Sequence, residues 1–276
     1  MNGPIAHVFG DLHLDPGGGP AVDEFCGWLN GIQSPRIVIL GDLFEAWFGP
    51  RTGSLSGARA VLESLLGAVE RGIPVDVVPG NRDFLLGSGF EARTGAVVRH
   101  GGVALPVEGG ALVLHGDELC TLDRGYLRLR AVLRNPAIVA LAQVLPRWAG
   151  AAVARRLRRA SVAAVAAKPS AEKQMQPAAA AAALEAASSD LLVVGHAHEF
   201  RVSELGPGQA WVVLDGWGGE RDVLEVHADG SYIPMSHRAV QGARSHRAVQ
   251  AAKDHRAVRK EETESLNDAQ GARLVP

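Results

Sequence analysis

The sequence has very few cysteines and no long uninterrupted apolar stretch. Its two cysteines, Cys26 and Cys120, exclude a disulfide framework and a CxxC zinc or redox site, and they fit a reducing compartment. A transmembrane helix needs about 20 consecutive apolar residues. The longest candidates, AIVALAQVL and the alanine run at 178–183, are too short or too weakly hydrophobic. We therefore expect a protein that is soluble or peripheral to a membrane.

Two further signals are missing. The first residues, MNGPIAHVFGDLHL, contain neither the basic region nor the long apolar region of a secretory signal, so no such signal is expected. The net charge is −2, so the chain lacks the basic balance of a general nucleic-acid-binding protein. Nucleic acid is therefore not an expected partner, and no obligatory protein partner is evident.

Short apolar runs dominate the pattern along the 276 residues. Several of them are separated by segments with helical spacing, which together predict an α/β sheet core. The predicted strands are 5–9, 37–40, 75–78, 111–114, 191–194, 211–214, 222–227 and 231–237.

A helical, basic segment interrupts this pattern between Gly116 and Leu191. Residues 124–173 hold eleven Lys or Arg and one acid, Glu172, a bias that is strong for a solvated helix surface, although that plainer interpretation stays open. We predict a core of residues 1–120 and 188–236 and a helical lid insertion at 121–187.

The C-terminal segment is repetitive. SHRAVQ occurs at 236–241 and 245–250, and DHRAV follows at 254–258. A nine-residue period is about 2.5 helical turns, so successive copies would face opposite sides of a helix, which argues against a coiled coil. Metal or nucleic-acid binding by the His-Arg pairs is the alternative to a low-complexity tail. The favoured prediction is a disordered tail at 237–276.

Polar motifs follow the predicted strands: GDLH, GDLFEAW, GNRD, HGDELC and GHAH. In open α/β sheets such residues converge beyond the carboxyl ends of the strands. The metal-type side chains among them are Asp11, His13, Asp42, Asn81, His115, His196 and His198. Oxygen and imidazole ligands without a thiolate suit Mn²⁺, Fe²⁺ or Zn²⁺. Seven ligands are too many for one ion, whereas two ions about 3.5–4 Å apart that share a carboxylate would use them all.

Each residue alone has a plainer interpretation. A single histidine is more often structural, an Asp after a strand often caps a helix, and the Gly-Asn of GNRD is ordinary turn chemistry. Metal-type ligands after five separate strands are improbable for simple turns. The joint pattern therefore favours a metal site.

These motifs resemble those of the calcineurin-like metallophosphoesterases over residues 5–235. The resemblance implies a β-sandwich core flanked by helices. Within that superfamily, GDLFEAWFG at 41–49 and GNRDFLLG at 80–87 are similar to the pyrophosphohydrolases of lipid A biosynthesis, which cleave a lipid-linked sugar nucleotide into UMP and lipid X. GDLHL at 10–14, HGDELCTLDRGY at 115–126 and GHAHEF at 195–200 extend the similarity.

The resemblance also implies roles for individual residues. One metal, usually Mn²⁺, would be held by Asp11, His13 and His198, the other by Asn81, His115 and His196, with Asp42 bridging the pair. Substrate contacts would come from Asn81, Arg82, Asp123, Tyr126, Arg158, Ser161, Lys168 and His196, while Val165 departs from the polar residue expected there. Asp83 and Asp117 are expected to orient ligands or Arg82. Glu45 and Trp47 are expected to brace the second loop.

Arg82 is the predicted catalytic side chain outside the metal ligands. The superfamily usually has histidine at this position, which can donate a proton, whereas arginine stays protonated. Arg82 can instead offer a bidentate fork to phosphate oxygens. This difference favours a diphosphate substrate.

The basic, apolar insertion fits the same interpretation. It would supply an apolar cleft for acyl chains and cations for the diphosphate, and it would dock on an anionic membrane. The expected location is cytoplasmic, peripheral on the inner membrane.

Two alternatives remain at this point. One is a metallophosphoesterase that acts on another nucleotide, a cyclic nucleotide or a phosphoprotein. The other is a non-catalytic scaffold of the same fold, which would be expected to lack ligands, whereas all seven are present.

Overall fold

The computed structural model describes residues 3–135, 137–140, 156 and 174–241. The chain divides into two units, Met1–His237 and Arg238–Pro276, and the fold below is that of the first. Residues 242–276, most of the predicted tail, lie outside the described residues.

Two mixed β-sheets form the centre of this unit. The first has the order β11-β10-β1-β2-β3-β4, with β1 at Ala6–Phe9, β2 at Ile37–Ile39, β3 at Val75–Val77, β4 at Val97–Val98, β10 at Val223–Val226 and β11 at Tyr232–Met235. The second has the order β5-β6-β7-β9-β8, with β5 at Val103–Leu105, β6 at Ala111–Val113, β7 at Leu191–Val194, β8 at Arg201–Gly206 and β9 at Gln209–Val213. Strands β1 to β4 pair in parallel, and β6 pairs in parallel with β7.

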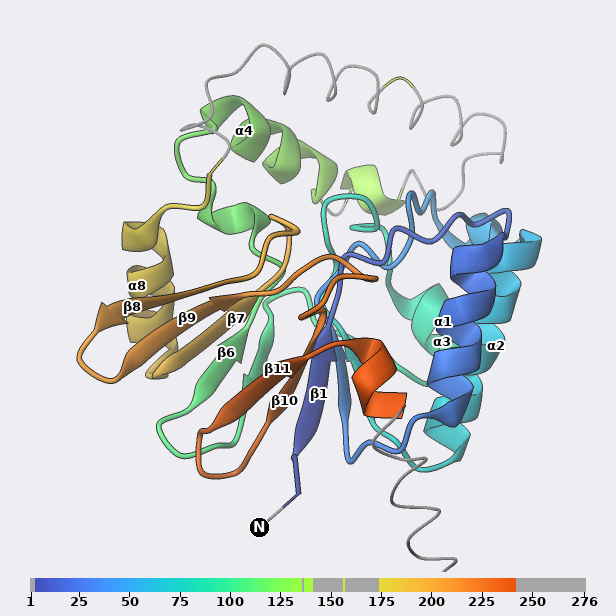
Figure 1. Cartoon of the computed structure of the whole chain (residues 1–276). Coiled ribbons are helices and arrows are strands. Elements are labelled where there is room, and N and C mark those ends of the chain that lie inside the picture. The colour runs from blue at the N-terminus through green and yellow to red at the C-terminus, as the bar shows by residue number, and fades with distance from the viewer. Residues whose placement is uncertain (1–2, 136, 141–155, 157–173, 242–276) are drawn as a thin grey trace, which may run out of the picture. The chain divides into compact units, whose positions relative to one another are not determined.

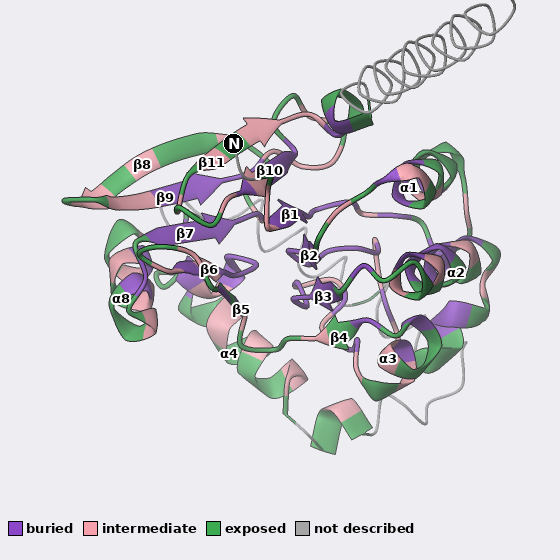
Figure 2. Cartoon of the chain, turned by 90° about the horizontal axis from the view of Figure 1, so that it is seen from below, coloured by how far each residue is buried: buried purple, intermediate pink, exposed green. Residues whose placement is uncertain are grey.

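The sheets pack face to face, and helices cover their outer faces. Val8, Val38, Val113, Val193 and Leu224 belong to the apolar cluster between the sheets. Helices α1 (Pro20–Gly31), α2 (Ser56–Glu70) and α3 (Ser88–Thr94) lie on one side of the strands and α8 (Pro177–Ala187) on the other (Figures 1 and 2). Central strands such as β2 and β7 are buried at every residue, which explains their uninterrupted apolar runs.

Helix α8 belongs to this packing although it falls inside the predicted insertion, 121–187. Its Ala180 and Leu184 are fully buried and pack in one cluster with Leu192, Val194 and Trp211 of the second sheet. Its alanine-rich sequence provides a smooth surface that lies close against the strands.

The remaining elements lie near the strand ends. They are η1 (Pro50–Ser54), η2 (Asp117–Leu119) and α4 (Arg124–Leu133). Helix α4 lies above the carboxyl ends of the strands (Figure 1). No helix within the described residues is both long enough and apolar enough to cross a bilayer.

The predicted fold class, a two-sheet α/β core flanked by helices, is confirmed, and the eight predicted strands are all present. The last strand ends at Met235, and His237 begins a helical turn instead of continuing the strand. Three strands were missed, β4, β5 and β8. Strand β4 has two residues and β5 three, and β8 is an edge strand whose exposed residues give no apolar run.

Candidate metal centre

The seven candidate ligands follow the carboxyl ends of strands from both sheets. Asp11 and His13 follow β1, Asp42 follows β2 and Asn81 follows β3 in the first sheet. His115 follows β6, and His196 and His198 follow β7 in the second. The parallel strands therefore bring residues 185 positions apart, such as His13 and His198, into contact.

The backbone at these ligands is strained. Positive φ angles are rare for residues other than glycine and cost about 1–3 kcal/mol each. Among the described residues the non-glycine cases are Asp11 (51°), His13 (48°), Asp42 (48°), His196 (67°), His198 (55°) and Ser188 (48°). Five of these six are candidate ligands, so the strain is concentrated where the ligand motifs turn away from their strands.

The glycines of the motifs allow close approach. A Cβ atom on Gly80 would lie 2.2 Å from Oδ1 of Asp42, and one on Gly195 would lie 2.3 Å from Oδ2 of Asp11. Both distances are far below van der Waals contact. Gly80 of the GN motif and Gly195 of the GH motif are thus required, because a carboxylate from a neighbouring loop occupies the space that a side chain would need.

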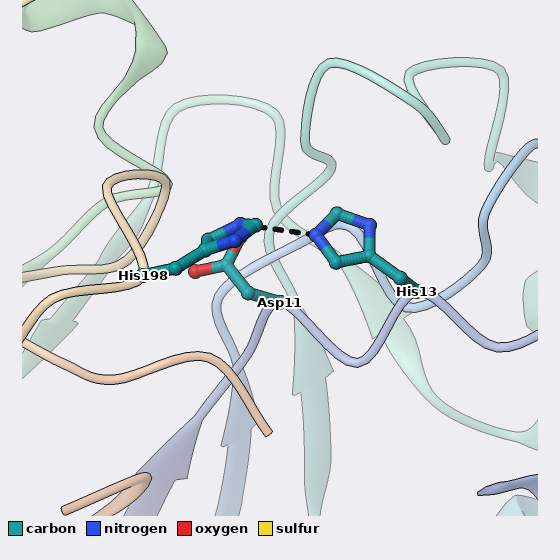
Figure 3. Close-up of side chains that lie close together, drawn as sticks. All are labelled: Asp11, His13 and His198. Carbon is teal, nitrogen blue, oxygen red and sulfur yellow. Dashed lines mark hydrogen bonds and ion pairs between the residues drawn. The ribbon is translucent and has the colours of Figure 1, made fainter. Parts of the chain in front are cut away.

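Asp11, His13 and His198 form one side of the centre, which we call the open half (Figure 3). The Nε2 atoms of the two imidazoles are 3.0 Å apart, and Nε2 of His198 is 3.3 Å from Oδ1 of Asp11. Oδ1 of Asp11 and Nδ1 of His13 are buried and have no hydrogen-bond partner. Oδ1 of Asp11 converges with the Nε2 atoms of His13 and His198, an arrangement that fits a divalent cation. Nδ1 of His13, in contrast, faces Asp42 and Glu45.

Asn81, His115 and His196 form the other side, which we call the braced half. Nδ1 of His115 donates to the carbonyl oxygen of Leu40 at 2.6 Å, which leaves Nε2 directed at Oδ1 of Asn81, 3.0 Å away. A fixed Nδ1 proton makes Nε2 the metal-binding nitrogen. The rings of His115 and His196 are 5.1 Å apart.

Asp42 lies between the halves. Its Oδ2 is 3.9 Å from Nδ1 of His13 in the open half, and its Oδ1 is 3.9 Å from Nε2 of His115 in the braced half. Asp11, Asp42 and His115 also offer atoms that all lie within 4.8 Å of one another. A bridging carboxylate requires this placement.

The four histidines differ in charge state. Burial lowers the pKa of His13 and of His196 to about 4, so both are neutral near pH 7. Burial opposes protonation of His115, but Asp42 and Asp11 outweigh it and raise its pKa to about 9. The adjacent Asp11 carboxylate, 3.3 Å from Nε2, raises the pKa of His198. Each half therefore contains one imidazole ready to bind a cation and one that competes with a proton.

Asp83 links the loop after β2, which carries the GD motif, to the loop after β3, which carries the GN motif. This fully buried carboxylate accepts hydrogen bonds from the backbone nitrogens of Leu43 and Gly80, each at 2.7 Å. Burial raises its pKa. The two bonds fix the loop that carries Asp42 against the loop that carries Asn81.

Arg82 lies beside Asp42. Its backbone nitrogen donates to Oδ1 of Asp42 at 2.8 Å, and its Nε is 3.5 Å from Oδ2. Its guanidinium also donates to Oε1 of Glu45 at 2.7 Å. Trp47 stacks on Phe44 and donates its backbone N–H to the Arg82 carbonyl oxygen. Glu45 and Trp47 thus contact the arginine loop directly.

The predicted substrate residues fall into two groups. Asp123 is buried, and its Oδ1 caps α4 by accepting the backbone N–H of Tyr126 at 2.8 Å. The Tyr126 hydroxyl donates to Asp117. Arg158, Ser161 and Lys168, together with Val165, lie outside the described residues.

Sequence patterns missed two side chains near the centre, Arg130 and Arg134. Both reach from α4 to the loops of the braced half, and their spacing of four residues puts them on one face of the helix. That spacing was the available signal, but it was hidden among the other arginines of the basic segment.

No protein-family profile matches the chain. Several curated proteins are similar to it in sequence. The chain is 35% identical to the UDP-2,3-diacylglucosamine hydrolase of Klebsiella pneumoniae over 79% of its own length and 93% of the relative. It is 36% identical to that of Xanthomonas campestris (80% and 94%) and 33% identical to that of Azotobacter vinelandii (82% and 96%).

Solved structures are more remote. The phosphopantetheinyl hydrolase of Mycobacterium tuberculosis is 15% identical, with 77% of this chain and 90% of that chain covered and a TM-score of 0.37. Such a distant likeness adds nothing to what the sequence relatives show.

Proposed function

The chain belongs to the UDP-2,3-diacylglucosamine hydrolase family, and on this premise we propose that it hydrolyses the pyrophosphate bond of UDP-2,3-diacylglucosamine. The products would be UMP and lipid X, 2,3-diacylglucosamine 1-phosphate, as lipid A biosynthesis requires. The observation that carries the proposal is the identity of 33–36% to hydrolases of this name along almost their whole length. The convergence of all seven ligand-type side chains supports it.

The proposed centre holds two Mn²⁺ ions. Asp11, His13 and His198 would bind one, Asn81, His115 and His196 the other, and Asp42 would lie between them. When bound, two such cations activate a water nucleophile and polarise the oxygens of the α-phosphate. The convergence of Oδ1 of Asp11 with Nε2 of His13 and Nε2 of His198 supports the first set, and the fixed Nδ1 proton of His115 supports the second.

Arg82 would bind the substrate and would not transfer a proton. A guanidinium stays protonated, so it cannot serve as a general acid. Held by Glu45 and by Asp42, it offers fixed N–H donors to the diphosphate and stabilises the charge that develops during attack. The diacylated sugar 1-phosphate would leave without needing a strong acid.

We propose a location on the cytoplasmic face of the inner membrane, and side chains on and just before α4 support docking on a membrane surface. Leu122, Leu129 and Val132 are exposed, and Arg124 and Arg128 are exposed beside them. Apolar and basic side chains together suit an anionic membrane surface. Sedimentation with vesicles of anionic lipid tests this location: binding that is lost in Leu129→Glu supports it, and no binding by the unaltered chain contradicts it.

The direct test is incubation with UDP-2,3-diacylglucosamine and Mn²⁺. We expect UMP and lipid X to appear, to vanish with a chelator and to return when Mn²⁺ is restored. In ¹⁸O-labelled water the label should enter UMP, since the α-phosphate is attacked. Rapid cleavage of bis-p-nitrophenyl phosphate without action on the lipid nucleotide would instead show a phosphodiesterase of different specificity.

A further inference from the structure

Two arginines of the α4 region reach the loops that carry the braced half. Nε of Arg130 donates to Oδ2 of Asp117 at 2.8 Å. Arg134, one turn further, donates to the carbonyl oxygens of Gly80 at 3.2 Å and Pro79 at 3.4 Å, and lies 3.6 Å from Oδ2 of Asp117. Arg130 of α4 and Arg134 at its C-terminal end therefore contact the two loops that carry His115 and Asn81.

Asp117 links the first of these contacts to a ligand. It follows His115 by two residues, is fully buried and begins η2. A buried carboxylate is strongly destabilising unless it is paired. The Tyr126 hydroxyl and Arg130 supply the pairing, both from α4. If α4 moves away, the loop after His115 can no longer keep this carboxylate buried in the same place.

Arg134 acts on the second loop through its backbone. The carbonyl oxygens of Pro79 and Gly80 directly precede Asn81, the oxygen ligand proposed for the braced half. A guanidinium that spans two successive carbonyls restricts the peptide planes on which the Asn81 direction depends.

The contacts are one-sided. Among the described residues, the side-chain hydrogen bonds and ion pairs of Arg130 and Arg134 go to residues 79, 80, 117 and 118, next to Asn81 and His115. The ligands of the open half lie in the turns after β1 and β7, and within the described residues no side-chain hydrogen bond or ion pair of Arg130 or Arg134 reaches those turns. A change in α4 should therefore affect one half of the centre and spare the other.

We propose that Arg130 and Arg134 are positioning residues that set the cation affinity of the braced half, so that the helix at the start of the insertion is coupled to one of two metal sites. This inference rests on the proposed function for its two cations but not for the identity of the substrate. By reciprocity, a cation in the braced half would also stabilise the docked position of α4.

The test compares full-length variants in cation binding. Arg130→Gln, Arg134→Gln and the double variant are titrated with Mn²⁺ by calorimetry after metal removal, beside the matched control Arg128→Gln. Arg128 lies on the same helix and is exposed. Loss of a group that orients a ligand typically lowers metal affinity about 10–100-fold. We expect that loss at one of two sites in the double variant and no change in the control.

Two outcomes of this titration would overturn the inference. One is unchanged affinity at both sites in the double variant. The other is equal weakening of both sites, which would indicate general destabilisation. Binding of a single Mn²⁺ by the unaltered chain would also overturn it.

A second readout separates positioning from folding and needs no metal. In hydrogen exchange of the metal-free double variant, amides at 80–83 and 116–120 should lose protection while those at 9–13 keep it. Arg130→Lys should recover part of the Mn²⁺ affinity because the ion pair with Asp117 is retained. Uniform loss of protection would contradict the proposal.

The two proposals fail separately. If the unaltered chain ignores the lipid nucleotide but shows the one-sided loss of Mn²⁺ affinity in the double variant, the substrate is wrong and the coupling stands. If it cleaves the lipid nucleotide while the double variant binds both ions normally, the coupling alone is wrong.

Discussion

The open and braced halves of the centre are built in different ways. The side chains of His13 and His198 in the open half are 20% and 44% exposed, whereas that of His115 in the braced half is 1% exposed. Asp11, His13 and His198 all have positive φ angles, whereas in the braced half His196 has one and His115 and Asn81 do not. Strained turns therefore aim every ligand of the open half, while in the braced half hydrogen bonds fix His115, which contacts both Leu40 and Asn81.

The orientation of a ligand side chain can thus be fixed either by backbone strain or by buried hydrogen-bond partners. Backbone strain needs no partner side chain, so the open half can remain accessible to solvent and substrate. A network of buried partners needs protection from water, and Asp83, Asp117 and α4 provide it. Substitutions of the buried partners should therefore weaken chiefly the braced half, and substitutions of Asp42 should damage both.

The largest effect is expected for Asp42→Asn. The charge and one of two acceptor oxygens are lost between the halves, and removal of one member of a catalytic unit typically costs at least about 10³-fold in rate. Turnover of UDP-2,3-diacylglucosamine with saturating Mn²⁺ measures this, with circular dichroism to verify folding. Retention of activity within tenfold in a folded variant would contradict the shared carboxylate.

Arg82→His should come next. The guanidinium contacts of Arg82 would be lost, and removing a donor that stabilises developing charge costs about 10²–10³-fold. Mn²⁺ binding should remain nearly normal in both halves, since the backbone N–H to Asp42 is kept. Steady-state kinetics on the lipid nucleotide give the outcome, and an increase in rate would refute the phosphate-binding role.

Asp83→Asn should weaken Mn²⁺ binding about 10–100-fold, chiefly in the braced half. Asparagine has one acceptor oxygen where the carboxylate uses two, so either the Gly80 or the Leu43 bond is lost. Asp76→Asn is the control, because Asp76 is equally buried on β3 but pairs with Arg36 and Arg99. Calorimetric titration should show normal Mn²⁺ affinity in the control. Equal losses in the two variants would mean that fold stability, not loop placement, sets the affinity.

The smallest effect is expected for the pH dependence of cation binding to the braced half. His115, with a pKa raised to about 9, keeps its proton at pH 7 in the metal-free protein, and a ligating imidazole must be neutral. Cation binding to the braced half should therefore release a proton, and affinity there should rise about tenfold per pH unit for each proton released. Calorimetry in buffers of different ionisation enthalpy counts the protons. Affinity that is independent of pH between 6 and 8 would exclude this charge state.

The sequence predicted all but three of the strands in the described residues and the candidate ligands that the structure brings together, but not the surrounding contacts. Asp11, Asp42 and His115 could be found because each lies just after an apolar run. A position at the end of a strand can be recognised from the local sequence alone. The pairing of Asp83 with Leu43 or of Arg134 with Gly80 depends on how separate loops meet, which no local pattern encodes.

The same limit applies to the helices. The alanine-rich sequence at 177–187 predicts the helix α8, but it does not predict that Leu184 packs with Trp211 of the second sheet. The family resemblance of CTLDRGY implies substrate contacts for Asp123 and Tyr126, yet it does not reveal that one caps α4 and the other donates to Asp117. Their proposed substrate contacts remain predictions beside these observed structural contacts.

The most direct test of the account is the electron paramagnetic resonance spectrum of the chain loaded with two equivalents of Mn²⁺. Two ions about 3.5–4 Å apart that share Asp42 should give a spin-coupled spectrum, which Asp42→Asn should convert to that of isolated ions. Two uncoupled Mn²⁺ signals in the unaltered chain, or saturation at one equivalent, would contradict a single centre built from two halves.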